Sequence, residues 1–361
     1  MSISIINHSA AINHTVAVVL DKELPARTGI SNFFPRQTIA TNMVSTLIKK
    51  NKNYISLDIV NYGEGKFNKE SKVQENFYVP PVYEEGYFFD TDSLYMTTVA
   101  NGLLTSVPAN NQIAQKALNQ MRLNREMIER SIIKQQWDFA TTGIVVLKNG
   151  DNVNYQRSAA SIVDITSYGA TYWNDSALSH PLGDYQKAGA YLRNKGRSKA
   201  RTFYSIMKSS TYNLLVKNTE IKELLNSRRA NRAELHMPEI DLVSGMNYQG
   251  TLSTTDFEII LVTYDDSYLS PTTNLDVDFL ADNLVVNIPT DFKGATIFAA
   301  LKAKGMANVG VNANVPVLKE AEYSLRDFWD DRSLTGGLLL NSSPLVMPVD
   351  VDLIHTMKVL A

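Results

Sequence analysis

Paired carboxylates are the residues of this sequence whose type and spacing could do chemistry. Two Asp-Val-Asp triplets occur, Asp276/Asp278 and Asp350/Asp352. Alternate residues of a β-strand point to the same face of a sheet, so each triplet would place two carboxylates side by side. Carboxylate oxygens suit a divalent cation such as Mg²⁺ or Mn²⁺. The triplets therefore leave open a metal-dependent enzyme built on Asp276 and Asp278, although short acidic patterns also arise by chance.

The other residues that could do chemistry lack the spacing that the chemistry needs. Asp265 and Asp266 follow an apolar strand, as in polymerase carboxylate pairs, but no second acidic strand accompanies them. The five histidines never occur at i,i+4 or in an HExxH motif, so a zinc site is not indicated. The sequence GEGK at 63–66 lacks the first glycine of a P-loop, because that position is Val60. We therefore expect no catalytic, cofactor-binding or metal-binding residues and no cofactor.

A basic run is the remaining candidate for ligand binding. Lys or Arg occupies every second position from Arg193 to Arg201. Such a run can contact phosphates, but it lacks the interleaved aromatic side chains on which single-strand binders stack bases. A solvated face, or a salt-bridging face between subunits, is the favoured interpretation. The net charge of −2 likewise argues against a chain that binds polyanions over its whole surface.

The overall composition is that of a globular protein. A chain of 361 residues can bury a sizeable core and would form two or three lobes. The hydrophobic share of 44% and the charged share of 20% are ordinary values. The absence of cysteine excludes disulfides and fits a protein made in a reducing cytoplasm. No run of about 18 apolar residues is present and the first residues lack the basic start of a signal peptide, so we expect no membrane span.

The element that must position everything else is one long helix, predicted from Ala109 to Thr142. Pro108 precedes it and Gly143 follows it, as expected at the start and the end of a helix. Its apolar residues form two lines at three- and four-residue steps: Ala114, Ala117, Leu118, Met121, Ile128 and Ile132, then Ile133, Trp137 and Ala140. Its charged pairs at i,i+4 are Arg125/Glu129, Glu126/Arg130 and Lys134/Asp138. The helix would be roughly 50 Å long, and such a strut needs a layer to lie on.

Two β-hairpins flank this helix in the sequence. The strand-like segments Tyr54–Tyr62 and Phe77–Val79 enclose a charged stretch. They would form a long hairpin that leaves the body and lies on a partner, because an isolated two-stranded ribbon is marginally stable. After the helix, an apolar strand at Ile144–Leu147, the turn Asn149-Gly150 and a return strand predict a second, shorter hairpin.

The second half of the chain alternates helices and strands. A helix is predicted from Pro181, a strand at Phe203–Met207 and one helix from Ser209 to Leu225. Phe257–Tyr264 is the most apolar strand and is predicted to be central in a sheet. Gly336-Gly337 is predicted to be a hinge, and the alternating tail after it is expected to join a sheet. This half therefore predicts an α/β lobe.

Six stretches of the sequence follow one another in the order found in one protein family. They read SNFFPRQTIATNMVSTLI, YISLDIVNYGEG, FNKESKVQENFYVPP, LNREMIERSIIKQQWDFATTGIVVLKNG, MNYQGTLSTTDFEIILVTYDDSYL and NSSPLVMPVDVDLIHTMKVLA. Together they resemble the major capsid protein E family of lambda-like tailed phages. In that family, the first two such stretches lead into an extended loop, and the third forms the loop and its return. The fourth forms the spine helix and the following hairpin, the fifth forms a late strand, and the sixth is a C-terminal signature. The resemblance runs from about Phe33 to the last residues, and the residues before it show no clear correspondence.

The resemblance implies a fold and a division of the chain. The fold is the Hong Kong-phage type of capsid fold, an α+β fold of tailed-phage major capsid proteins. The implied ranges are 1–49 for an N-terminal arm, 50–90 for an extended β-hairpin loop, 91–199 with 335–361 for a peripheral domain carrying the spine helix 109–142, and 200–334 for an α/β axial domain.

The resemblance also implies a structural function and no enzyme activity. Copies of the chain would self-assemble through a procapsid into hexamers and pentamers of an icosahedral head shell, in a bacteriophage or prophage. The shell would enclose double-stranded DNA, which it would approach without specific contacts. Its partners would be other copies of itself and, in addition, scaffolding, portal and decoration proteins, with no membrane. The protein would be located in the virion after assembly in the host bacterial cytoplasm.

Three alternatives remain open at this point. One is the metal-dependent enzyme built on Asp276/Asp278, and another is a cellular nanocompartment shell of the same fold. The last concerns crosslinking, because some relatives join neighbouring subunits by an isopeptide bond between a loop Lys and an Asn. Lys66, Lys69 and Lys72 lie on the expected loop, but the sequence singles out no Asn as their partner.

Overall fold

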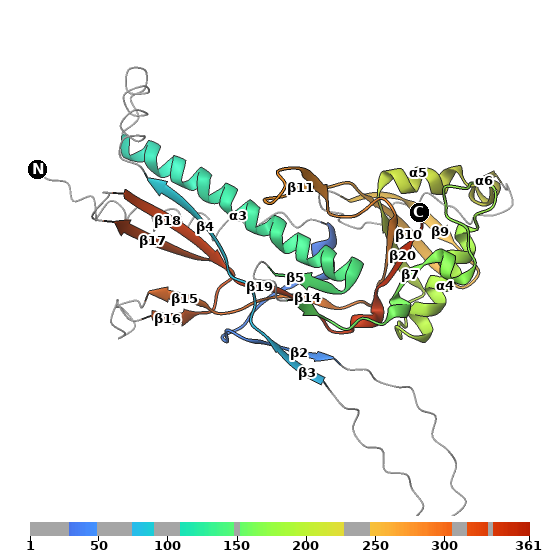
Figure 1. The fold of residues 1–361 in the computed structure, drawn as a ribbon, viewed down its shortest axis with the longest axis horizontal. Coiled ribbons are helices and arrows are strands. Elements are labelled where there is room, and N and C mark those ends of the chain that lie inside the picture. The colour runs from blue at the N-terminus through green and yellow to red at the C-terminus, as the bar shows by residue number, and fades with distance from the viewer. Residues whose placement is uncertain are drawn as a thin grey trace, which may run out of the picture.

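The computed structural model describes residues 29–48, 74–89, 109–147, 152–226, 246–304, 316–330 and 335–361. In this part of the chain, a long helix runs along one side of the molecule and joins two regions (Figure 1). One region is a six-stranded sheet with its helices, and the other is a three-stranded sheet beneath the long helix; a second three-stranded sheet lies between them. None of the described helices has the length and apolar character needed to cross a membrane.

The long helix is α3, which spans Ala109–Thr142 as predicted. It ends where Gly143 adopts a left-handed conformation with a φ of 72° and donates its N–H to the Phe139 carbonyl at 3.0 Å. The two apolar lines of the helix enter different cores. The first line gives Ala117, Met121, Ile128 and Ile132 to a cluster with Leu338 and Leu340, and the second gives Ile133, Trp137 and Ala140 to the central core. One helix therefore stabilises two parts of the molecule.

The three-stranded sheet beneath α3 is antiparallel. Its order is β17 (Ser324–Asp330), β18 (Thr335–Ser342), β4 (Tyr83–Phe89). The prediction of a hinge at Gly336-Gly337 is wrong, because both glycines lie inside β18 and pair with residues of β17 and of β4. Ladder hydrogen bonds on both sides hold this backbone in the sheet.

The six-stranded sheet is the largest in the described part of the chain. Its order is β7 (Ile162–Asp164), β20 (His355–Lys358), β13 (Leu284–Pro289), β8 (Thr202–Met207), β10 (Glu258–Tyr264), β9 (Met246–Ser253). Strand β10 is paired on both sides, as its apolar sequence predicts, but it lies next to the edge strand β9. The central positions belong to β13 and β8, so the prediction that Phe257–Tyr264 is central is only partly correct.

Three helices accompany this sheet: α4 (Pro181–Asn194), α5 (Ser209–Lys217) and α6 (Thr219–Asn226). The start of α4 at Pro181 agrees with the prediction. The single helix predicted for Ser209–Leu225 is wrong, because the chain leaves the helical conformation at Asn218, with ψ of 140°. The Asn218 amide donates to the Ser179 carbonyl at 3.1 Å and accepts from the Glu220 N–H at 2.9 Å. These bonds stabilise the break and cap α6.

The middle sheet contains β1 (Arg36–Thr38), β14 (Gly294–Phe298) and β19 (Pro344–Pro348), in that order, and the 3₁₀ helix η1 (Gly29–Phe33) precedes β1. Strand β1 is parallel to β14, and β14 is antiparallel to β19. The buried Phe34 ring lies edge-on to the rings of Phe139 and Phe292. A Cβ at Gly294 would lie 2.4 Å from the Phe34 ring, so this position requires glycine.

Four two-stranded ladders complete the described structure. They are β2 (Val44–Ile48) with β3 (Gln74–Tyr78), β5 (Ile144–Val146) with β6 (Asn152–Asn154), β11 (Ser267–Leu269) with β12 (Asp276–Asp278), and β15 (Leu301–Lys304) with β16 (Pro316–Lys319). The β5–β6 pair confirms the short hairpin, whose turn lies outside the described residues. In the β2–β3 ladder the first strand begins at Val44, earlier than the start predicted for the long hairpin, and the residues between the two strands lie outside the described ones. The predicted strand Tyr54–Tyr62 lies outside the described residues.

The tail joins sheets, as expected, because its strands β18, β19 and β20 belong to three different sheets. The sheets do not follow the ranges implied for the domains. Strands β7 and β20 come from 91–199 and 335–361 but complete the sheet that 200–334 otherwise builds. Strand β14 comes from 200–334 but pairs with β1 and β19. An open sheet edge is completed by any strand that can satisfy its hydrogen bonds, whatever the separation in sequence.

Candidate assembly surfaces

One aspartate of each triplet, Asp278 and Asp352, is engaged in a contact with another residue of the protein. Asp276 and Asp278 are exposed on β12. The Asp278 carboxylate accepts a hydrogen bond from Lys208 Nζ at 2.6 Å, and Lys208 also contacts Asp282 at 2.9 Å. Within the described residues, no group of three or more His, Cys, Asp or Glu side chains is placed to hold a metal ion. The ammonium of Lys208 thus occupies the position beside Asp278 that a cation would need.

The second aspartate triplet is not on a strand. Asp350 precedes the 3₁₀ helix η5 (Val351–Leu353), which contains Asp352. The prediction that both carboxylates share one face of a strand is therefore wrong for this triplet. Asp352 accepts a hydrogen bond from the Ser158 N–H at 2.7 Å, which ties the tail to the segment after β6.

The pair Asp265-Asp266 is also engaged in hydrogen bonds with neighbouring residues. Asp265 accepts hydrogen bonds from the Ser209 N–H, at 3.0 Å, and from the Ser209 hydroxyl at the start of α5. A carboxylate at this place satisfies backbone groups that have no partner within the helix. Asp266 accepts from the Tyr264 hydroxyl at 3.2 Å and from the Ser267 N–H at 2.9 Å. Both carboxylates are therefore engaged in hydrogen bonds within the protein.

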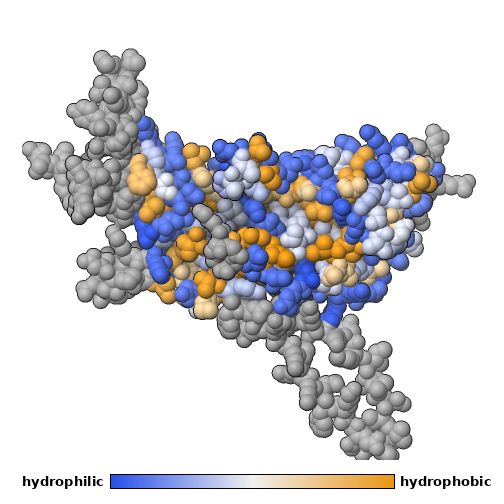
Figure 2. Space-filling model, in the orientation of Figure 1, coloured by the Kyte–Doolittle hydropathy of each residue, from blue (hydrophilic) through white to orange (hydrophobic). Residues whose placement is uncertain are grey.

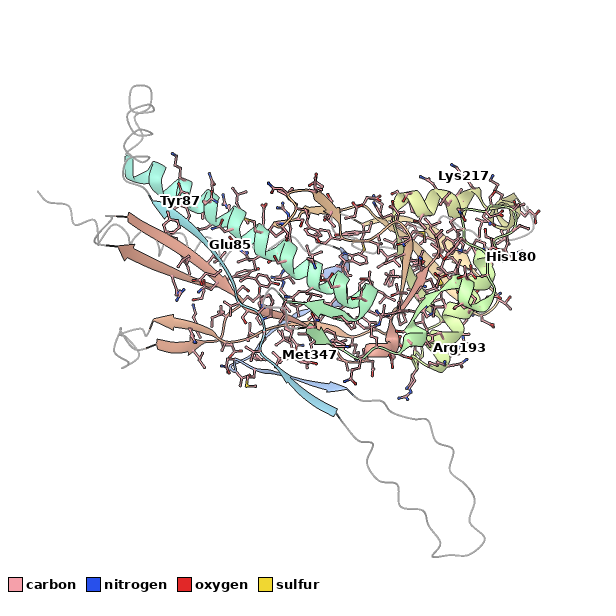
Figure 3. All side chains as sticks on the ribbon, in the orientation of Figure 1. Glu85, Tyr87, His180, Arg193, Lys217 and Met347 are labelled. Atoms are coloured by element: carbon pink, nitrogen blue, oxygen red, sulfur yellow. The ribbon has the colours of Figure 1, made fainter. Side chains whose placement is uncertain are left out.

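The basic run does not form one continuous stripe. Arg193 lies in the last turn of α4, and its guanidinium stacks 4.5 Å from the centre of the Phe257 ring. Arg197 has a positive φ of 64° in the turn after the helix. His180 and Arg193 lie at the outer side of the α4 region (Figure 3). The run is thus a solvated turn region, which agrees with the favoured interpretation. The loop lysines Lys66, Lys69 and Lys72 lie outside the described residues.

Exposed apolar side chains gather where the long hairpin leaves the body. Met43, Val79 and Val82 are 46%, 63% and 63% exposed at the base of the β2–β3 ladder. The ladder itself points away from the body (Figure 1). On the face shown in Figure 2, hydrophobic residues form a band across the middle of the described surface. Exposed apolar side chains that gather in this way are suited to contact with another protein.

The outward side of α3 is a second exposed surface. Leu123 and Met127 are exposed one turn apart, and the exposed ion pair Glu126–Arg130, at 3.7 Å, lies beside them on the same helix. Beneath α3, strands β17 and β4 form the two edges of the three-stranded sheet. Edge strands present backbone hydrogen-bonding groups that a neighbouring molecule can use. This region is therefore suited to lateral contacts.

Half-buried ion pairs between Arg36, Glu129 and Glu322 hold α3 on the body. Glu129 was predicted to pair with Arg125 along the helix, but it binds Arg36 of β1, whose Nη1 donates to Glu129 Oε1 at 3.0 Å. Tyr323 also donates to Glu129, and Arg36 reaches Glu322 at 3.1 Å. Burial alone would lower the pKa of Arg36, but the hydrogen bond and charge of Glu129 raise it above its ordinary value. Lys134–Asp138, at 2.5 Å, confirms another of the predicted helix pairs.

Arg157 fixes the end of α3 to the six-stranded sheet. Its Nη1 donates to the carbonyls of Phe139 and Ala140, at 3.0 and 2.8 Å, and its Nη2 donates to the Ile354 carbonyl at 2.8 Å. A cation at the C-terminal end of a helix also interacts favourably with the helix dipole. Burial lowers the pKa of Arg157 to about 10, so the group stays charged at neutral pH. Sequence reasoning missed this residue, because nothing in its neighbourhood marks it as buried.

A row of buried polar side chains crosses the face of the six-stranded sheet beneath α4. Ser205, Asn287 and His355 are in register on the neighbouring strands β8, β13 and β20. Ser205 hydrogen bonds with the Tyr185 hydroxyl at 3.0 Å, and the Tyr191 ring lies 4.9 Å from the His355 ring. Asn287 is 0% exposed, and neither polar atom of its side chain finds a hydrogen-bond partner among the described residues. The sequence signal that could have revealed this row is a polar residue inside each of the apolar stretches LVVNIP and LIHTM.

The fold is similar to that of solved phage proteins. The crystal structure of the putative capsid protein of a prophage of Escherichia coli CFT073 matches with a TM-score of 0.63 and 15% identity, covering 98% of this chain and 98% of that chain. A phage-related protein of Bordetella bronchiseptica RB50 matches with a TM-score of 0.47 and 9% identity, covering 97% and 96%. The SrpI encapsulin of Synechococcus elongatus PCC 7942 matches with a TM-score of 0.46 and 7% identity, covering 95% of this chain and 95% of that chain. The first of these likenesses shows that the chain has a phage-capsid fold.

The family follows from the sequence. Residues 14–359 match the sequence profile of the family described as Phage major capsid protein E. The chain therefore belongs to the phage major capsid protein E family, and its function is that of a structural shell protein. The match begins at residue 14, well before the stretch at Phe33 from which the resemblance was expected. No match was found among curated protein sequences.

Proposed function

We propose that copies of this chain assemble into hexamers and pentamers that close an icosahedral head shell around double-stranded DNA. The family match over residues 14–359 carries this proposal. The exposed apolar base of the β2–β3 hairpin and the open edges of the sheet beneath α3 supply surfaces for the contacts between copies. Because closed symmetry uses each patch many times, contacts of modest strength are sufficient.

The partners are other copies of the chain, together with a scaffolding protein, a portal protein and a decoration protein. Assembly takes place in the cytoplasm of the bacterial host and delivers the protein to the virion. The net charge of −2 supports an inner surface that encloses DNA without binding it strongly or specifically. The chain has no enzyme activity in this proposal, since Asp278, Asp265 and Asp352 are all bound by protein groups.

The division into arm, loop, peripheral domain and axial domain is part of the proposal, with boundaries that follow the sheets. The axial domain consists of the six-stranded sheet with α4, α5 and α6, and so includes β7 and β20. The peripheral domain consists of α3 and the sheet of β17, β18 and β4. Arg157 and Thr356 both bind the end of α3, and they form the joint between the two domains.

Negative-stain electron microscopy of the purified chain, beside size-exclusion chromatography, tests the assembly. We expect closed shells, tubes or six-fold capsomers. The matched variants are Val82→Asp, which places a charge on the apolar hairpin base, and Val82→Thr, which keeps the shape of the side chain. Val82→Asp should abolish assembly while leaving a folded subunit, and Val82→Thr should assemble. A subunit that stays monomeric even with co-expressed scaffolding protein, or shells filled with foreign protein in place of DNA, would contradict the proposal.

A further inference from the structure

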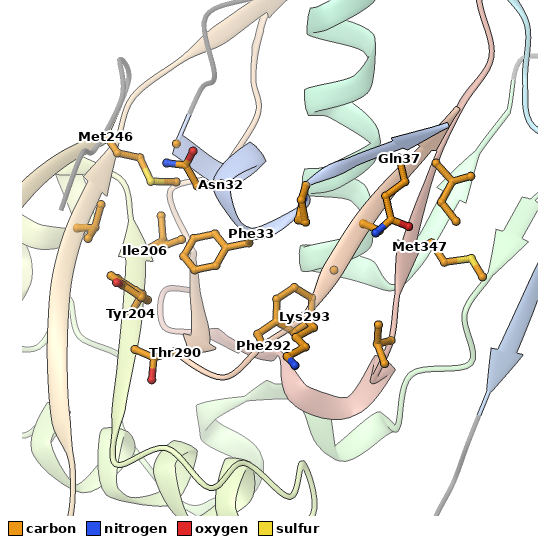
Figure 4. A pocket seen from close by; sticks show the side chains of 17 residues that line it. Asn32, Phe33, Gln37, Tyr204, Ile206, Met246, Thr290, Phe292, Lys293 and Met347 are labelled. Carbon is orange, nitrogen blue, oxygen red and sulfur yellow. The ribbon is translucent and has the colours of Figure 1, made fainter. Parts of the chain in front are cut away.

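An apolar groove of about 720 Å³ lies on the face of the six-stranded sheet opposite the polar row. Its floor is formed by Tyr204 and Ile206 of β8, and the 3₁₀ helix η1 contributes Phe33, whose ring lies edge-on to Tyr204 at 5.3 Å. Met347 of β19 and Met246 of β9 line opposite sides (Figure 4). The groove therefore joins the six-stranded sheet to the middle sheet.

One wall of the groove is a sheet face that the rest of the described chain leaves uncovered. Strand β14 directs Thr296 to α3, where the Gln136 side chain donates to it at 3.1 Å. Ile297 follows Thr296 along the strand and therefore points to the opposite face, into the groove. Ile297 and Met347 are half-buried, and Val349 beside them is exposed. An apolar surface of this kind in an unassembled subunit would favour aggregation unless a further segment covers it.

The chain outside the described residues leaves from the wall of this groove. Gly29, the first described residue, lines the groove, and a Cβ at Gly29 would lie 2.2 Å from the Met246 side chain. Residues 1–28 precede it and contain the apolar segment Thr15–Leu20, TVAVVL. Residues 21–28 separate this segment from Gly29, and eight residues span at most about 26–29 Å. The segment is thus tethered within reach of the groove.

The composition of the segment supports the same occupant. Its apolar side chains match the mostly apolar lining of the groove. We propose that Thr15–Leu20 covers this groove on its own subunit, with its apolar side chains against Phe33, Ile297 and Met347. A short tether gives the segment an effective concentration in the millimolar range, so a modest contact is sufficient. The same segment of a second copy has no such advantage before assembly.

The absence of cysteine makes this proposal open to a direct test. In the double variant Val18→Cys/Met347→Cys, the introduced pair provides the two thiols of the chain, and a disulfide forms only where the Cα atoms approach within about 7 Å. Oxidation of the unassembled full-length subunit should give an intrachain link, seen as a faster-migrating band of monomer mass on a non-reducing gel. Val16→Cys/Met347→Cys covers the alternative register of the segment.

The matched control is Val18→Cys/Val146→Cys, since Val146 is 64% exposed on β5 and does not line the groove. This control should remain unlinked. Linked dimers of the Met347 variants would show that a second copy supplies the segment, which overturns the proposal. No link in either register, or equal linking in the control, would overturn it as well. The readout uses unassembled subunits, so a failure here leaves the proposed shell function unaffected.

Discussion

The six-stranded sheet and the sheet beneath α3 are buried in different ways. The six-stranded sheet packs against a core on each face, because Phe203, Ile259 and Val285 face one core while Ile260 and Val286 face the other. The sheet beneath α3 has a single small core, and its edge strands β17 and β4 have one paired neighbour each. Small sheets with open edges gain much of their stability from further contacts. We infer that the six-stranded region is stable in the subunit, whereas the region around α3 is completed by neighbouring copies.

Substitution of Arg157, at the joint between the two regions, should have the largest effect on the free energy of unfolding. Arg157→Ala removes four hydrogen bonds from a largely buried guanidinium to backbone carbonyls, and we expect it to lower the free energy of unfolding by roughly 3–5 kcal/mol. Urea unfolding of the subunit measures this cost. Arg193→Ala is the control, because Arg193 is exposed and stacks only on Phe257, and it should cost less than about 1 kcal/mol. Similar costs for the two variants would mean that Arg157 is not a joint.

Cavities created by the same substitution in each region allow the stability of their cores to be compared directly. Ile259 and Ile132 are both fully buried, the first in the six-stranded sheet and the second between α3 and its sheet. We expect Ile259→Ala to cost about 4 kcal/mol and Ile132→Ala about 2 kcal/mol in the subunit, because the smaller core can collapse around a cavity. Urea unfolding provides both values. Equal losses would contradict the difference in packing from which the comparison starts.

Acid should lower the stability of the six-stranded region. Burial, and then the charge of Arg157, lower the pKa of His355 to about 3, whereas an unfolded histidine has a pKa near 6.5. Between these values the unfolded state binds the proton and the folded state does not, so stability is lost as the pH falls from about 6.5 towards 3. The slope should approach 1.4 kcal/mol per pH unit for this one group.

The control for this prediction is His355→Gln, which keeps a polar side chain but cannot titrate. Asp352 and Tyr191 also lie near His355 and Arg157, so both proteins are compared over the same pH range. The variant should show a smaller loss of stability between pH 6 and 4, as measured by urea unfolding at each pH. Identical pH profiles would exclude His355 as the cause.

The smallest effect is expected at Asp278. The Asp278 carboxylate is about half exposed, with 49% of its side chain accessible, so its ion pair with Lys208 adds little to stability. Asp278→Ala should change the free energy of unfolding by less than about 0.5 kcal/mol and leave assembly intact. Calorimetric titration with Mn²⁺ should give no binding for either protein. Binding to the parent chain that Asp278→Ala abolishes would restore the metal-dependent alternative.

Local signals made some elements predictable. The bounds of α3 follow from Pro108 and Gly143, and the two apolar lines follow from residue spacing alone. The β5–β6 hairpin follows from the Asn149-Gly150 turn signal. These elements are determined by residues close together in the sequence, so no tertiary information was needed.

Other features depend on contacts between distant residues. The break at Asn218 is stabilised by Ser179, 39 residues away, so the sequence around it reads as one continuous helix. Gly336-Gly337 is held by strands β17 and β4 rather than by its own turn chemistry. The absence of a catalytic or metal site remains a prediction, and the ion pair of Asp278 with Lys208 was not visible in the sequence because 70 residues separate the two side chains.

The position of β20 has a consequence for how the protein is made. Strand β20 lies inside the six-stranded sheet, between β7 and β13, although it is the last strand in the described chain. A ribosome adds about 5–20 residues per second, so β7 waits roughly 10–40 s for its partner strand to be synthesised. Strand β7 lacks its neighbour during that time, whereas β13, which ends at Pro289, lacks it for only about 3–13 s. The sheet is therefore completed only when the end of the chain has been synthesised. A subunit can present its complete surface to other copies only after that point.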